Sequence, residues 1–159
     1  RTNFDNSEWS DRLVLHEGRI QDFASENYYN LIISNPPFFE NSKKSGDEAK
    51  DLARHTDQLA YTELIFAACN LLKEGGTFAV IIPTENAEKF IRLSQAQGLY
   101  CNRRCDVKPT PEKDAKRSLL AFNKFRDDLS TNSIVIEDNG RHQYSEDYVK
   151  LTEEFYLNF

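Results

Sequence analysis

The sequence of 159 residues contains no methionine, only three cysteines and no long apolar run. Apolar stretches such as residues 78–82, closed by Pro83, are far shorter than the roughly 20 residues that a membrane-spanning helix needs. The odd number of cysteines, without the spacing of a disulfide framework, predicts a reducing cytoplasm. Cys101 and Cys105 could be two ligands of a metal ion, but no second pair or nearby histidine completes a set of four. Ordinary strand cysteines, Cys69 included, are the better interpretation, and no metal site is expected.

Composition also bounds the size and location of the protein. Its 39% hydrophobic and 12% aromatic residues are enough to bury one core, so one compact unit is expected. The chain opens with Arg1 and has no basic segment followed by an apolar one, which would mark a secretory signal. We therefore expect a cytoplasmic protein, and a chain that is a fragment of a longer one.

Charge is unevenly distributed. The formal net charge of -6 argues against nucleic acid as a partner when only the total is considered. Residues 103–126, however, contain eight basic residues and three acidic ones. Such a stretch is either a solvated face or a surface that contacts phosphate groups, and the sequence leaves both interpretations open.

Apolar periodicity predicts strands and a helix in the first half of the chain. Residues 13–15 and 31–33 are short β-rich runs ended by turn residues, and both are expected to be buried strands. Between residues 57 and 73 the apolar residues recur at helical spacing, and the pair Gly75-Gly76 supplies a stop.

The following segments predict a strand, a helix and then two strands in succession. Residues 77–82 are a near-continuous apolar strand, and Thr84 can cap a helix that ends at Gly98. Two strands are then expected, joined by a charged, proline-bearing loop, with a short edge strand after them: 100–107, 118–125 and 134–136.

The end of the chain predicts one more helix. Ser145 can cap it, and its buried face would carry Tyr148, Leu151 and Phe155. Taken together, the elements predict an α/β fold with a mostly parallel sheet and an antiparallel end.

A doubled proline follows the strand expected at residues 31–33. Asn35, Pro36, Pro37 and Phe38 lie where open α/β sheets place their ligand sites, beyond the carboxyl ends of the strands. The prolines remove backbone donors and fix φ, so that neighbouring carbonyl groups point rigidly into the cleft as acceptors. Such acceptors suit an amine substrate, although the tetrapeptide could also be a simple turn that ends a strand.

The motif resembles that of methyltransferases that modify exocyclic or side-chain amines, in which Asn or Asp, two prolines and Tyr or Phe follow the fourth strand. Asn35, Pro36, Pro37 and Phe38 match it position by position. The resemblance implies that the Asn35 side-chain oxygen and the Pro36 carbonyl accept the two hydrogens of the amine, and that Phe38 stacks on a flipped base. Because a sulfonium methyl is already activated, such an enzyme mainly aligns and desolvates the amine.

The same resemblance implies a site for S-adenosylmethionine. In this fold an acidic residue after the third strand commonly accepts the amine of the cofactor's adenine, and Asp22 stands at the matching position. Phe23 offers its backbone N–H and a ring edge. An aspartate that caps the next helix would give the same pattern.

Other segments are similar to those of the bacterial family that methylates an adenosine next to the anticodon of a valine transfer RNA. They are residues 35–39, 53–55, 117–122 and the tail 144–157, and the resemblance covers essentially the whole chain. It implies RNA contacts by residues of the connection that covers the cleft and of the basic stretch: Lys43, Lys44, Arg54, His55, Lys116 and Arg117. His16 and His142 receive no role.

Parts of the family's pattern are missing. The glycine-rich loop for the cofactor's methionine end and the acidic residue for its ribose would lie before Arg1. The chain is therefore expected to be the C-terminal part of a single methyltransferase domain. It would contain the end of a helix, parallel strand and helix units, and an antiparallel end with a last helix: 1–9, 10–107 and 108–159.

The family's sheet order, three, two, one, four, five, seven, six, has a consequence for pairing. The strand at residues 13–17 would be third, so without its inner neighbours it cannot pair with residues 31–33. We expect an incomplete sheet, an altered pairing, or a second chain that supplies strands. We also expect the chain alone not to bind S-adenosylmethionine tightly, which micromolar binding in calorimetry would refute.

The sequence leaves two other functions open. Protein glutamine N5-methylation uses the same Asn-Pro-Pro chemistry on a side-chain amide, and the acceptor, a release-factor peptide or a tRNA, distinguishes the two. A non-catalytic fragment that binds RNA or protein is the other. The tail and the basic stretch around Lys116 and Arg117 favour a tRNA methyltransferase.

Overall fold

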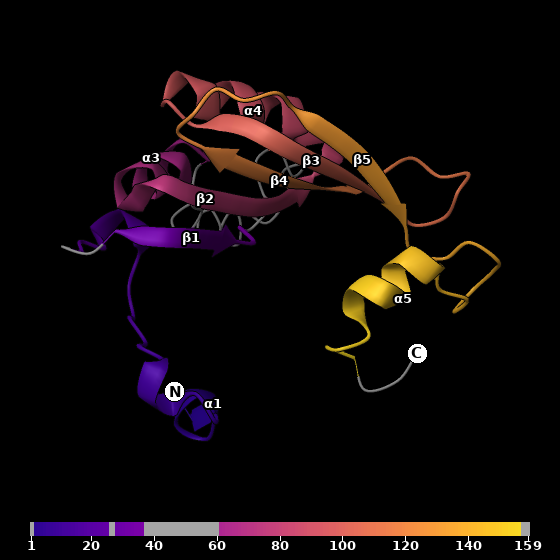
Figure 1. Cartoon of the computed structure of the whole chain (residues 1–159), viewed down its shortest axis with the longest axis horizontal. Coiled ribbons are helices and arrows are strands. Elements are labelled where there is room, and N and C mark those ends of the chain that lie inside the picture. The colour runs from indigo at the N-terminus through magenta and orange to yellow at the C-terminus, as the bar shows by residue number, and fades with distance from the viewer. Residues whose placement is uncertain (1, 26–27, 37–60, 157–159) are drawn as a thin grey trace, which may run out of the picture.

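The computed structural model describes residues 2–25, 28–36 and 61–156, which contain a five-stranded sheet (Figure 1). Its strands, in spatial order, are β1 (Tyr29–Ser34), β2 (Leu72–Pro83), β4 (Arg117–Asn123), β3 (Tyr100–Lys108) and β5 (Ser130–Val135). All run in one direction except β4, which lies antiparallel between β2 and β3. The α/β fold with a mostly parallel sheet is confirmed, and β4 with its hairpin partner β3 forms the antiparallel part.

Two helices, α3 (Tyr61–Leu71) and α4 (Ala87–Ala96), cover one face of the sheet (Figure 1). The core between them is aromatic: the Phe90 ring lies 5.7 Å from that of Phe122 and 5.1 Å from that of Tyr61, and Phe78 stacks on Phe122 at 5.9 Å. Alternate residues of β2 and β4 point into this core, as the period of two in a strand requires. No helix in the described ranges is long and apolar enough to cross a membrane.

The junction between α3 and β2 differs from the prediction. The helix ends at Leu71 and the strand begins at Leu72, so Gly75 and Gly76 lie inside β2 and do not stop the helix. The pairing of β1 with β2 is irregular here, because the register jumps between Tyr29 and Leu31. The glycines accommodate this irregularity of the strand.

The helix after β2 begins through a short 3-10 turn, η3 (Thr84–Asn86), and ends as predicted before Gly98, whose φ of 81° suits glycine. The prediction that Thr84 caps this helix is wrong, since no side-chain cap hydrogen bond forms there. The Thr84 hydroxyl oxygen lies 3.2 Å from that of Ser118 on β4 instead.

The predicted strand at residues 13–17 is absent, and this prediction is wrong. The segment between the turns η1 (Ser10–Arg12) and η2 (Ile20–Asp22) is extended and exposed, with Val14 74% accessible. Figure 1 shows it with α1 (Thr2–Asp5) apart from the sheet. A strand needs a hydrogen-bonding neighbour as well as an apolar pattern, and none of the described strands lies beside this segment.

The strand predicted at residues 31–33 exists as β1, but it is not buried. Ile32 packs against the core, whereas Leu31 and Ile33 point to the opposite face, where Ile33 is 74% exposed. Among the described strands only β2 pairs with β1, so the outer edge of β1 is open and the sheet is incomplete there. Pairing of this edge with a second chain stays a prediction.

The end of the described chain carries α5 (Glu146–Thr152). The Ser145 hydroxyl caps it by accepting a hydrogen bond from the Tyr148 N–H at 3.1 Å, as predicted. The expected burial is wrong for Leu151 and Phe155, which are 60% and 82% exposed, and Tyr148 is only half-buried.

The predicted edge strand is confirmed as β5, which pairs with β3.

Candidate active site at the carboxyl edge of the sheet

One edge of the sheet contains the carboxyl ends of four strands, β1, β2, β3 and β5, and the beginning of the antiparallel strand β4. Asn35 and Pro36 follow β1 at this edge, one and two residues beyond the last pair, Ser34 with Val80. Asn35 is exposed and Pro36 is buried. The asparagine side chain is thus free to meet a ligand, while the buried proline holds the backbone that carries it. Pro37 and Phe38 lie outside the described residues.

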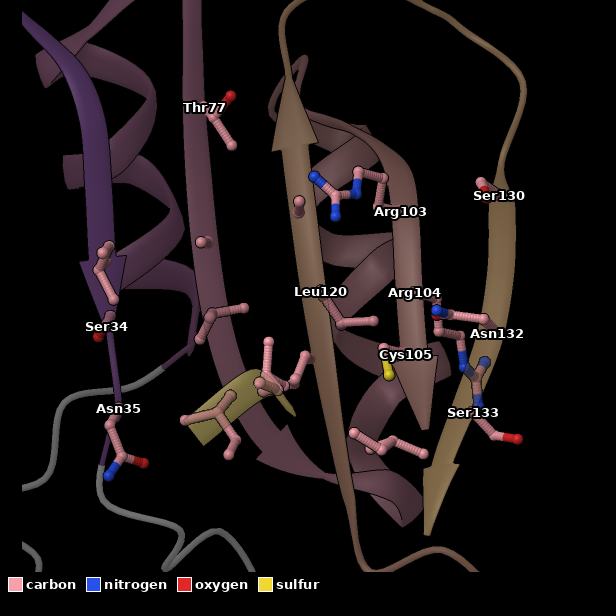
Figure 2. Close-up of a pocket in the computed structure, with 18 of the residues that line it drawn as sticks. Ser34, Asn35, Thr77, Arg103, Arg104, Cys105, Leu120, Ser130, Asn132 and Ser133 are labelled. Carbon is pink, nitrogen blue, oxygen red and sulfur yellow. The ribbon is translucent and has the colours of Figure 1, made fainter. Parts of the chain in front are cut away.

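Asn35 borders a broad hollow of about 880 Å³ on the sheet face that α3 and α4 leave uncovered. Figure 2 shows Asn35 beyond the end of β1, with Cys105 and Asn132 on strands at the other side of the hollow. Asp147 and Leu151 of α5 also line it. Its floor consists largely of apolar strand residues: Leu31, Ile33, Ala79, Ile81 and Leu119. Asn35 thus lies at the border of a largely apolar hollow.

The predicted RNA-binding residues Lys116 and Arg117 stand at the same edge. Both are exposed, and Arg117 is paired across the sheet with Pro83 at the end of β2. With roughly 4.8 Å between neighbouring strands and about 3.3 Å per residue, the backbones of Asn35 and Arg117 lie about 12 Å apart. The structure therefore places the basic pair and Asn35 at the same edge of the sheet. Lys43, Lys44, Arg54 and His55 lie outside the described residues.

The predicted cofactor residues occupy a different hollow. Asp22 is exposed and Phe23 half-buried in a depression of about 640 Å³ lined by residues 14–20 and 22–24. The Phe23 ring meets that of His16 edge-on at 5.0 Å. The turn that carries Asp22 is held to α3 by a hydrogen bond that the Gln21 amide donates to the Glu63 carboxylate at 2.8 Å. The structure does not place Asp22 and Asn35 in one cavity.

A polar network at the same edge of the sheet, between β4, β3 and α4, was missed by the sequence analysis. The Arg104 guanidinium donates to Glu88 at 2.6 Å and to Asp106 at 2.9 Å, and the Ser118 hydroxyl donates to the same Asp106 oxygen at 2.6 Å. Thr84 extends the network from the end of β2. Its one sequence signal is the spacing of Arg104 and Asp106, which places both on one face of a strand.

The charge state of Asp106 follows from these contacts. Partial burial raises the pKa of its carboxyl, but the hydrogen bonds from Arg104 and Ser118 and the charge of Arg104 outweigh burial and hold the pKa below its usual value. Asp106 is therefore an anion at neutral pH.

The cysteines have a different environment. Burial raises the pKa of the Cys101 thiol to about 11, so it is protonated at neutral pH and is a poor metal ligand. In the part of the chain that the structure describes, no group of three His, Cys, Asp or Glu side chains is placed to hold a metal ion.

Comparison with known proteins identifies the family. A family model described as Eco57I restriction-modification methylase matches residues 2–103. The tRNA1(Val) (adenine(37)-N6)-methyltransferase of Flavobacterium psychrophilum is 42% identical over 98% of this chain and 67% of its own length, and that of Trichodesmium erythraeum is 39% identical over 100% and 67%. The chain belongs to the tRNA1(Val) (adenine(37)-N6)-methyltransferase family. It also falls among the Eco57I-type methylases, and it spans about two thirds of the length of these relatives.

Solved structures agree on the fold of this family member. A predicted O-methyltransferase of Agrobacterium tumefaciens superposes with a TM-score of 0.71 at 17% identity, over 94% of this chain and 66% of that one. A type I restriction-modification methyltransferase subunit of Streptococcus thermophilus gives 0.51 at 16% identity, over 87% and 35%. The sheet is that of class I S-adenosylmethionine-dependent methyltransferases.

The residues around Asp22 fit one end of the cofactor of such enzymes. An exposed carboxylate can accept a hydrogen bond from an adenine amine, and the neighbouring Phe23 ring offers an apolar contact, both within one depression. The described residues of this depression therefore fit the adenine end of S-adenosylmethionine.

Proposed function

We propose that the protein that contains this chain methylates the exocyclic N6 of an adenosine next to the anticodon of a tRNA, of the tRNA1(Val) type. The family membership supports the reaction class, and one observation supports its location: Asn35 stands exposed at the carboxyl end of β1 while the following Pro36 is buried. An acceptor fixed in this way is what an amine substrate requires. We place the reaction in the cytoplasm, where tRNA is the substrate at hand.

Asn35 has the central role in this proposal. Its side-chain oxygen and the Pro36 carbonyl would each accept one hydrogen of the adenine amine, which directs the nitrogen lone pair at the incoming methyl group. S-adenosylmethionine supplies that methyl group as an activated sulfonium. Because no proton has to leave the amine before it attacks, the residues only orient and desolvate it. Phe38 is assigned by resemblance to stack on the flipped base.

Two further sets of residues complete the assignment. The Asp22 carboxylate would accept a hydrogen bond from the adenine amine of the cofactor, and Phe23 would lie beside the adenine. Lys116 and Arg117 would bind phosphate groups of the tRNA, and by resemblance the same role is proposed for Lys43, Lys44, Arg54 and His55. Arginine and lysine in this arrangement fix the position of an RNA strand without reading its sequence.

An Asn35→Ala variant tests the proposal. Methyl transfer from labelled S-adenosylmethionine to unmodified tRNA is measured with the full gene product that contains this chain. We expect kcat to fall about 100-fold or more, as when one preorganised polar group of an active site is removed. The melting temperature should not change, because Asn35 is exposed.

Asn132→Ala is the matched control, since Asn132 is also an exposed asparagine at the border of the same hollow. It should retain the wild-type rate. Equal rates for Asn35→Ala and the wild type would exclude the assigned role of Asn35. Transfer to a release-factor peptide in place of tRNA would favour glutamine methylation.

A further inference from the structure

The polar network at the carboxyl edge has a defined direction. The Ser118 hydroxyl has one proton, and the Asp106 carboxylate, 2.6 Å away, is an acceptor only. The proton in the 3.2 Å contact between Thr84 and Ser118 therefore comes from Thr84. A chain of hydrogen bonds thus runs from Thr84 through Ser118 to Asp106, and Arg104 with Glu88 holds its far end.

Two residues of this network, Thr84 and Ser118, adjoin the backbone of the basic pair Lys116-Arg117. The Lys116 carbonyl accepts a hydrogen bond from the Thr84 N–H at 3.3 Å, and the Lys116 N–H donates to the Val107 carbonyl at 3.0 Å. Ser118, the next residue after Arg117, is fully buried and fixed by Asp106. The backbone of Lys116 is thus held by η3 and by β3, and Arg117 lies between Lys116 and the fixed Ser118.

Taking the polar groups of this network out of water costs free energy that an apolar contact between the same strands would not cost. Ser118 is buried, and Thr84 and Asp106 are half-buried. Hydroxyl and carboxylate groups that are removed from water are stable only when their partners are in place, whereas apolar residues would hold two strands together without this requirement. A satisfied polar network, in contrast, specifies one geometry. The main-chain pairing of Ile82 with Ser118 and of Pro83 with Arg117 sets the separation of β2 and β4. The network adds side-chain contacts that fix Ser118, the neighbour of Arg117, against the end of β3 and the turn after β2.

We propose that Thr84, Ser118 and Asp106 are positioning residues that hold Lys116 and Arg117 at a fixed distance from Asn35, so that tRNA phosphate binding and target-base binding are in register. This inference rests on the proposed function. It assigns the network an effect on tRNA affinity and none on methyl transfer itself.

Hydroxyl removal in the full gene product tests it. Thr84→Val removes the hydroxyl at nearly constant shape, Thr84→Ser keeps it, and Ser118→Ala removes the second one. For Thr84→Val and Ser118→Ala we expect the Kd and KM for tRNA to rise roughly three- to tenfold, the size of one lost or misplaced phosphate contact, with kcat at saturating tRNA within about twofold of the wild type. Thr84→Ser should restore wild-type affinity.

Ser94→Ala is the matched control, because Ser94 is a buried serine of α4 whose hydroxyl has no hydrogen-bond partner among the described residues. Its Kd for tRNA should equal that of the wild type. In a double-mutant cycle, Ser118→Ala should add little to Arg117→Ala, since a positioning effect vanishes once the positioned side chain is gone.

Each outcome bears on the inference. Full additivity with Arg117→Ala, or an equal loss in kcat with unchanged Kd, would overturn the positioning role. Binding of tRNA by the wild type without methyl transfer would overturn the proposed function, while the Kd values would still decide the positioning role. Absence of tRNA binding by the wild type would overturn both.

Discussion

Gly76 in β2 lies directly against the carbonyl oxygen of Tyr29 in β1: a Cβ atom at position 76 would stand 2.9 Å from that oxygen and 2.8 Å from Leu72 Cδ1. Both distances are too short for a carbon atom. The approach follows from the irregular register of the two strands, in which Tyr29 pairs with Leu72 and Leu31 already pairs with Thr77. Glycine is the residue that permits it.

Gly76→Ala should therefore destabilise the protein by about 1–3 kcal/mol, the usual cost of forcing an extra carbon into a packed site. Gly75→Ala is the control, since a Cβ at position 75 meets nothing within 4 Å. Urea denaturation followed by circular dichroism measures both variants. Equal stability of the two would show that β1 and β2 are not packed as described.

Gly75 and Gly76 also show a limit of predicting structure from local sequence patterns. A glycine pair after a helical pattern predicts a stop, but these two belong to a strand, because the irregular pairing of β1 with β2 is a tertiary feature that no local pattern encodes. Residues 13–17 are a second example. Their apolar pattern predicts a strand, yet pairing needs a neighbour, and among the described strands none is beside them.

In the candidate site, too, some features could be predicted from the sequence and others could not. The position of Asn35 after β1 could be predicted, because a motif and a strand end are both local in sequence. The contact between Asp106 and Ser118 could not, since it depends on the register of the β3–β4 hairpin, and Thr84 joins from η3, the turn after β2. The cap at Ser145 was predictable because its partner, the Tyr148 N–H, is three residues away.

Removal of the basic pair should weaken tRNA binding in a salt-dependent manner. The double variant Lys116→Ala, Arg117→Ala would lose two phosphate contacts, so KM for tRNA should rise and the slope of log KM against log salt should fall by about 1.4, at roughly 0.7 for each contact to a single strand. The control removes the same charge from α4, where Lys89 and Arg92 are exposed on the helical layer. An identical slope for the basic-pair variant and the wild type would place the tRNA elsewhere.

Asp106 should make part of the stability of the protein dependent on pH. Its hydrogen bonds from Arg104 and Ser118 lower its pKa in the folded state, whereas the unfolded chain has the ordinary value of about 3.9. A group with a lowered folded pKa contributes stability that is present above the unfolded pKa and is lost as the pH falls through the folded pKa. The contribution is therefore complete at neutral pH and declines below about pH 4.

Asp106→Asn removes this contribution at every pH. The difference in unfolding free energy between the wild type and Asp106→Asn should stay constant from pH 8 to 5 and then narrow below about pH 4, which urea midpoints across this range would measure. Asp114→Asn, at an exposed position of the loop between β3 and β4, is the control and should stay within about 0.5 kcal/mol of the wild type. A difference for Asp106→Asn that does not narrow in acid would show that the carboxylate charge does not hold the network together, and that shape alone fixes β3 against β4.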